Sequence, residues 1–182
     1  QVLKKILMFA PEDIELRSAL STAYFNSENY DEALNHALCV IELDEKDPQA
    51  YCNLGSCYSA QNMVDEAVES FQKATEIDPD YSLPHTNLGS LYATIGRIEK
   101  AIKEFKLATT MNQSDSLAWM NLYSCYKEVG RMEDAQEAFR KYESLMNQGS
   151  QAEENSHIPG GVAQTGQLAS GADLDTASPG ME

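Results

Sequence analysis

Residues 48–81 read PQAYCNLGSCYSAQNMVDEAVESFQKATEIDPDY, a stretch in which apolar and small residues recur at intervals of three and four. This spacing is typical of helices that bury one face. It predicts two helices, over residues 49–61 and 65–78, separated by a turn. The predicted buried faces are Tyr51, Leu54, Gly55 and Tyr58 in the first helix, and Ala67, Val68, Phe71, Ala74 and Thr75 in the second.

The same pattern recurs every 34 residues along the chain. Three sets of residues share this spacing: Tyr24, Tyr58, Tyr92 and Tyr126; Leu20, Leu54, Leu88 and Leu122; Ala33, Ala67, Ala101 and Ala135. A fixed period of this length indicates a repeat array, in which one helix pair cannot bury both of its apolar faces without stacked neighbours. We therefore expect four units, at residues 14–47, 48–81, 82–115 and 116–149.

Residues at the expected helix ends agree with this division. Asn62, Gly96 and Gly130 follow the first helices, and these residue types accept the left-handed backbone that often ends a helix. Each second helix opens with an acid, which the helix dipole stabilises at that end. These acids are Asp31, Asp65, Glu99 and Glu133. Gly55 and Gly89 remove side-chain volume where two helices must approach closely.

The unit Tyr51-x-x-Leu54-Gly55-x-x-Tyr58, followed by Ala67, Phe71, Ala74 and Pro79, resembles the tetratricopeptide repeat family. The resemblance covers residues 14–149, and it implies an all-α, right-handed superhelical solenoid of antiparallel helix pairs. The last unit departs from the pattern at Tyr123 and Tyr142, where small residues are expected. The first unit is more degenerate, with Arg17, Ser21 and Ala37 at pattern positions.

The two ends of the chain differ from the repeats. Leu3, Ile6 and Pro11 keep the period, so residues 1–13 are predicted to be the second helix of an upstream half repeat, or alternatively a capping helix. Residues 150–182 are rich in Gly, Ser and Ala, contain acidic residues, and have no Lys or Arg. This composition predicts a flexible tail.

The formal net charge is −16. Residues 1–80 hold five basic and sixteen acidic side chains, whereas residues 81–149 hold eight of each. This acidity argues against nucleic acid and anionic membranes as partners, and a partner steered by charge should be basic. No apolar run is long enough to insert into a membrane. The four cysteines form no Cys-x-x-Cys pair, so a reducing, cytoplasmic location is expected.

Residues opposite the buried face of each first helix have no role within their repeat. The resemblance implies that first helices line a concave groove, so these residues are the predicted peptide-binding site. They are Asn53, Asn87 and Asn121; Thr22, Ser56, Ser90 and Ser124; and Glu15, Asn26, Gln49, Thr86, Met120 and Glu128. An asparagine amide both donates and accepts hydrogen bonds, so such a row can pair with the backbone of an extended peptide. The alternative is that the asparagines only cap or bridge neighbouring helices.

Family members that bind the acidic C-terminus of heat-shock chaperones use Lys and Arg in this groove. The matching places here hold Ser18, Cys52 and Thr86, with Leu83 and Asn87 further on. No basic clamp is present, so binding of a chaperone carboxylate is not expected.

The sequence offers no evident catalytic chemistry. His36 and Cys39 share a helix face, but no further ligand lies nearby at metal-binding spacing. We find no nucleophile paired with a base and no phosphate-binding glycine loop, and we expect no enzyme activity, metal or cofactor. The preferred interpretation is a protein–protein interaction scaffold. Two alternatives are a recruitment module cut from a longer enzyme, as in the repeat array of the O-linked GlcNAc transferase, and a self-associating module that forms homo-oligomers.

Overall fold

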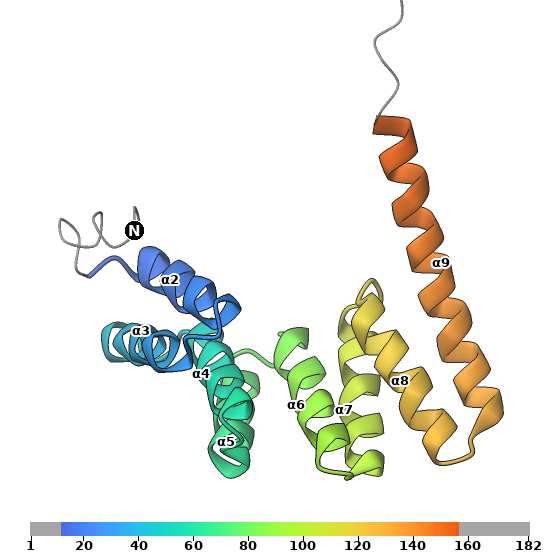
Figure 1. Ribbon diagram of the computed structural model, residues 1–182, viewed down its shortest axis with the longest axis horizontal. Coiled ribbons are helices and arrows are strands. Elements are labelled where there is room, and N and C mark those ends of the chain that lie inside the picture. The colour runs from blue at the N-terminus through green and yellow to red at the C-terminus, as the bar shows by residue number, and fades with distance from the viewer. Residues whose placement is uncertain (1–11, 157–182) are drawn as a thin grey trace, which may run out of the picture.

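The computed structural model describes residues 12–156, which form eight α-helices and no strand (Figure 1). Their bounds are α2 Ile14–Asn26, α3 Tyr30–Leu43, α4 Pro48–Ala60, α5 Val64–Ile77, α6 Ser82–Thr94, α7 Ile98–Met111, α8 Ser116–Glu128 and α9 Met132–Ser156. The helix expected before residue 12 and the tail after residue 156 lie outside the described residues.

The helices pack as consecutive antiparallel pairs, α2 with α3, α4 with α5, α6 with α7 and α8 with α9. First helices begin at residues 14, 48, 82 and 116, and second helices at residues 30, 64, 98 and 132. Every repeat therefore starts its helices at the same two positions, so the all-α solenoid is confirmed. The predicted helix limits in residues 48–81 are correct to within one residue. The last helix runs on to Ser156, past the boundary expected at residue 149.

One turn position in each repeat has a left-handed backbone. Asn62, Gly96 and Gly130 have φ angles of 60°, 73° and 75°, as their residue types predict. Glu28 occupies the same position in the first repeat with φ of 59°, although glutamate seldom adopts this conformation. The spacing of the repeat therefore fixes the turn even where the residue type does not favour it.

Within a repeat, a glycine of the first helix packs against a phenylalanine of the second. A Cβ atom added to Gly55 would lie 2.7 Å from Cδ1 of Phe71, and one added to Gly89 would lie 2.7 Å from Cδ1 of Phe105. Both rings are almost fully buried, at 1% and 0% exposure. Phe71 thus packs within its own helix pair, and glycine is required at both contacts.

The first and last repeats have other residues at this contact between their two helices. In the first repeat, Ser21 takes the place of the glycine and Ala37 takes the place of the phenylalanine, and both are buried. The larger residue on the first helix is thus matched by a smaller residue on the second. The Ser21 hydroxyl donates a hydrogen bond to the Ala33 carbonyl at 2.8 Å. In the last repeat an aromatic cluster replaces the contact, with the rings of Tyr123 and Tyr142 centred 5.0 and 6.2 Å from that of Phe139.

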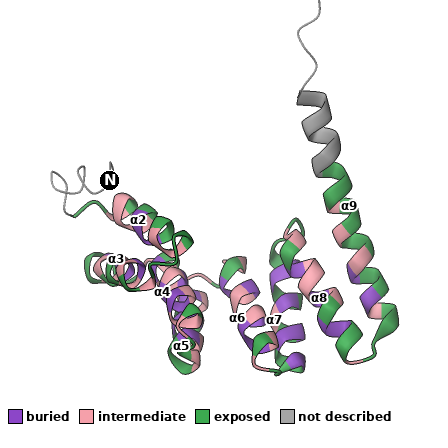
Figure 2. Cartoon of the chain, viewed as in Figure 1, coloured by how far each residue is buried: buried purple, intermediate pink, exposed green. Residues whose placement is uncertain are grey.

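Buried positions follow the faces along which the helices meet (Figure 2). Consecutive first helices approach one another, because α2 and α4, α4 and α6, and α6 and α8 each have Cα atoms within 8 Å. Within residues 12–156 no such approach joins α3 to α5, α5 to α7 or α7 to α9. First helices therefore form the inner side of the curved array, and second helices form the outer side. No helix in this part of the chain has the length and apolar character needed to cross a bilayer.

Candidate functional site

A continuous stripe of side chains runs along the inner side of the array. At 100° per residue, the second, sixth, ninth and thirteenth residues of each first helix point away from its buried face. We call these residues the inner stripe. It consists of Glu15, Ala19, Thr22 and Asn26 on α2; Gln49, Asn53, Ser56 and Ala60 on α4; Leu83, Asn87, Ser90 and Thr94 on α6; and Leu117, Asn121, Ser124 and Glu128 on α8.

Two asparagines of the inner stripe bridge neighbouring helices. Asn87 Nδ2 donates to Ser56 Oγ at 3.3 Å and lies 3.5 Å from Cys52 Sγ, while Asn121 Nδ2 donates to Ser90 Oγ at 3.5 Å. These bonds join α6 to α4 and α8 to α6, and they involve neither amide oxygen. Both asparagines therefore tie first helices together, and their carbonyl oxygens are left for another donor.

Asn53 differs from the other two asparagines. Its Nδ2 atom is buried and makes no hydrogen bond with any residue that the structure describes. It lines a small cavity of about 50 Å³ between α2 and α4, together with Ser21, Thr22, Phe25 and Ser56. A buried amide without a partner costs about 1–3 kcal/mol, so this cavity offers an acceptor group a favourable place to bind.

The hydroxyl column of the stripe is held by its own helices. Thr22, Ser56, Ser90 and Ser124 each donate to the carbonyl four residues earlier, at 3.1, 2.9, 3.0 and 3.1 Å respectively. Their oxygen atoms are therefore oriented as acceptors, which is how Ser56 and Ser90 receive the asparagine amides. The hydroxyls are fixed in direction before any ligand arrives.

The remaining predicted residues divide into two groups. Glu15, Asn26, Gln49 and Glu128 are exposed on the inner stripe, and Met120 is half-buried beside it. Thr86 does not lie on the open surface, because it is 1% exposed and donates a hydrogen bond to Asp115 Oδ2 at 2.7 Å. Its role is to hold α6 to the start of α8.

The prediction missed five residues of the inner stripe, and two of them are large apolar side chains. The five are Ala19, Ala60, Leu83, Thr94 and Leu117. Leu83 and Leu117 are 44% and 58% exposed, and each occupies the place that Gln49 holds in its own repeat. The spacing of 34 residues from Gln49 was sufficient to find them. Since no residue in the described part of the chain covers them, they add two large apolar contacts to a surface that is otherwise polar apart from Ala19 and Ala60.

Burial keeps two cysteines near the stripe in their neutral form at ordinary pH. Burial raises the pKa of the Cys52 thiol from 9.0 to about 12, although hydrogen bonds from Asn87 and Tyr81 oppose the shift. Burial likewise raises the pKa of Cys57 to about 11. A neutral, buried thiol is unreactive. In residues 12–156 no three His, Cys, Asp or Glu side chains are grouped to hold a metal ion, and His36 instead stacks on Tyr24 with ring centroids 5.5 Å apart.

Comparison with known proteins supports the repeat assignment. Two tetratricopeptide repeat models match the chain, at residues 48–81 and 70–103. No curated protein matches the sequence significantly.

Solved structures share the fold. A crystal structure of MamA superposes with a TM-score of 0.70 at 21% identity, covering 82% of this chain and 87% of MamA. A second MamA structure gives a TM-score of 0.65 at 21% identity, covering 88% of this chain and 85% of that protein. PilF from Pseudomonas aeruginosa gives 0.70 at 16% identity, covering 79% of this chain and 65% of PilF. The helix pairs, their 34-residue period and the family matches over residues 48–103 together show that the chain contains tetratricopeptide repeats.

Proposed function

We propose that the inner stripe binds an extended segment of another protein, and that the chain acts as a non-catalytic interaction scaffold. The observation that carries this proposal is the exposure of Leu83 and Leu117 on neighbouring first helices, at 44% and 58%. Exposed leucines on a concave polar surface are typical of a protein-binding site. A tetratricopeptide array implies protein partners, and these leucines indicate where one would bind.

The polar residues of the stripe suit a peptide backbone. Asn87 and Asn121 keep their carbonyl oxygens out of the bonds between helices, and a backbone N–H can donate to such an oxygen. Asn53 supplies an amide nitrogen that lacks an acceptor within residues 12–156. We infer that backbone contacts provide modest affinity and that the leucines select for apolar side chains of the partner.

The charge of the stripe favours some partners over others. Its only charged residues are Glu15 and Glu128, at opposite ends, and it contains no Lys or Arg. An acidic C-terminal carboxylate would find no basic partner there, so the expectation that chaperone tails do not bind remains part of this proposal. The cysteines at positions 39, 52, 57 and 125 are all free, which is consistent with the reducing, cytoplasmic compartment that we propose.

Peptide selection on the intact chain tests this function. A peptide chosen from a random displayed library is titrated by fluorescence anisotropy against the wild type and a Leu83→Ser/Leu117→Ser variant. Each leucine is about half exposed, so losing both contacts should weaken binding by about thirtyfold. A control variant, Leu38→Ser/Leu43→Ser, removes two exposed leucines of α3, away from the stripe.

The control variant should bind as the wild type does. Equal binding by all three proteins would show that the partner does not use the inner stripe. Asn53→Ala provides an independent check, because this amide holds no neighbouring helix and its removal should not loosen the array. We do not expect the same of Asn87 or Asn121, whose removal would also break contacts between helices.

A further inference from the structure

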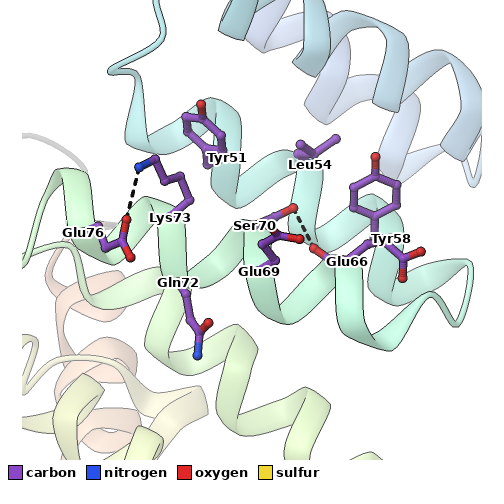
Figure 3. Close-up of a pocket in the computed structure, with 9 residues that line it drawn as sticks. All are labelled: Tyr51, Leu54, Tyr58, Glu66, Glu69, Ser70, Gln72, Lys73 and Glu76. Carbon is purple, nitrogen blue, oxygen red and sulfur yellow. Dashed lines mark hydrogen bonds and ion pairs between the residues drawn. The ribbon is translucent and has the colours of Figure 1, made fainter.

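A second open site lies on the opposite side of the array, at the second repeat. A cavity of about 540 Å³ runs along the seam between α4 and α5 (Figure 3). Tyr51, Leu54 and Tyr58 come from α4, and α5 contributes Glu66, Glu69, Gln72, Lys73 and Glu76, with Ser70 between them. Two aromatic rings and three carboxylates thus border one cavity, and none of these residues belongs to the inner stripe.

In the third and fourth repeats, the chain's own cations lie on the equivalent tyrosines. Lys100 Nζ lies 5.4 Å from the ring centre of Tyr92, and Arg131 Cζ lies 4.6 Å from that of Tyr126. Tyr58 is the same residue of the second repeat, 34 residues before Tyr92 and 68 before Tyr126. A cation over a tyrosine face is a favourable contact, so this position attracts positive charge in both later repeats.

In the third repeat, the residue equivalent to Tyr51 also has a partner within the chain. His85 occupies the place of Tyr51, and its Nδ1 shares a 2.8 Å hydrogen bond with Glu104 Oε2. Both side chains are largely buried, at 12% and 17% exposure. In the third repeat, the Tyr92 ring therefore has Lys100 as a partner, and the Glu104 carboxylate has His85.

The second repeat lacks these internal partners. Glu66 stands where the third repeat has Lys100, and Glu69 stands where it has Lys103. Lys73 borders the cavity, but its ammonium pairs with Glu76 Oε2 at 3.1 Å (Figure 3). Among residues 12–156, no cation lies over the ring of Tyr51 or Tyr58, and Glu66 and Glu69 form no ion pair.

We propose that this cavity binds a lysine or arginine side chain of a basic protein segment. The incoming cation would lie against the Tyr58 ring and between the carboxylates of Glu66 and Glu69, in the position that Lys100 and Arg131 hold in their own repeats. Charge complementarity supports this partner, because residues 1–80 carry sixteen acidic and five basic side chains. The alkyl part of a long cationic side chain would cover Leu54 and the tyrosine rings. The site is separate from the inner stripe, so one chain can hold two partner segments.

The internal comparison suggests the test. Glu66→Lys places a lysine where the third repeat already carries one, so this variant should fold and supply its own cation to Tyr58. The control is Glu45→Lys, which changes the net charge equally at an exposed residue outside the cavity. The probe is a fluorescein-labelled peptide of alternating lysine and glycine, and its counterpart with glutamine in place of lysine measures non-specific binding. Circular dichroism checks that every variant keeps its helices.

Anisotropy titrations of the full-length variants should show that Glu66→Lys weakens binding of the lysine peptide by about tenfold relative to Glu45→Lys, since it adds repulsion and occupies the ring. Equal weakening by the two variants would mean that only overall charge attracts the peptide, and it would overturn the proposal, as would absence of binding to the wild type. If Glu66→Lys does not fold, two double variants replace it. Glu66→Gln/Glu69→Gln removes two carboxylates from the cavity, and Glu45→Gln/Asp80→Asn removes two carboxylates outside it as the control. Leu83→Ser/Leu117→Ser should leave this binding unchanged, so failure here and failure of the inner stripe are distinguishable.

Discussion

The contact between Gly89 and Phe105 allows a quantitative test of how the repeats pack. A Cβ atom at residue 89 would lie 2.7 Å from both Cδ1 and Cε1 of Phe105, and 2.9 Å from Cζ. Carbon atoms in contact normally lie about 3.5–4.0 Å apart, so Gly89→Ser forces the ring or the helix to move by about 0.8 Å. Overpacking of this kind costs about 1–3 kcal/mol, of which the better helix propensity of serine recovers about 0.5 kcal/mol.

The first repeat shows how this clash can be relieved, because it carries Ser21 opposite Ala37 at the equivalent positions. Phe105→Ala alone should cost about 3–5 kcal/mol, since the ring is fully buried. The double variant Gly89→Ser/Phe105→Ala should be about 1–2 kcal/mol more stable than the sum of the two single changes, because the serine fills part of the vacated space.

Urea unfolding followed by circular dichroism measures the free energies, and hydrogen exchange in α6 and α7 shows whether the loss is local, as expected for a repeat array. Gly130→Ser is the matched control. Gly130 has φ of 75° and no atom within 4 Å of an added Cβ, so its cost comes from backbone strain alone. The costs of Gly130→Ser and Phe105→Ala in free energy of unfolding should add in the double variant. If the costs of Gly89→Ser and Phe105→Ala also add to within about 0.3 kcal/mol, the proposed packing is refuted.

Two further predictions concern buried polar groups. Burial raises the pKa of the Cys52 thiol from 9.0 to about 12. Because the unfolded chain loses this proton at a lower pH than the folded chain, the free energy of unfolding should be unaffected below pH 9 and should fall as the pH rises toward 12. Cys52→Ala should reduce this fall, which is measured as the urea midpoint at each pH. Asp115→Ala should cost about 2–4 kcal/mol, because Asp115 caps the Ala118 amide at 2.9 Å and also accepts from Thr86. Asp47→Ala removes a cap alone and should cost about 1 kcal/mol by the same denaturation assay; equal losses would show that the Thr86 bond contributes nothing.

Much of the fold could be predicted because helix burial is a local, periodic property of the sequence. The buried stripe of residues 51–58 places α4, and the 34-residue period carries the same assignment to the other repeats. Left-handed turns at Gly96 and Gly130 follow from the residue type. The turn at Glu28 does not, because there the geometry of the repeat overrides a local preference.

The site was less predictable because it depends on contacts between repeats. The inner stripe follows from helix geometry, but the bonds from Asn87 to Ser56 depend on the spacing and rotamers of two adjacent helices. Burial of Thr86 likewise arises from its contact with Asp115, 29 residues later in the sequence. The two ideas about the asparagines, peptide contact and bridging, are thus compatible at Asn87 and Asn121, which bridge through nitrogen and leave oxygen for a ligand.

We propose that the inner side of the array holds a peptide. The most direct measurement is backbone-amide NMR of the intact chain during titration with a peptide selected from the random library. We predict that the largest shift changes fall on α4, α6 and α8, near Asn53, Leu83 and Leu117. Changes confined to the outer helices α3, α5 and α7 would contradict the claim.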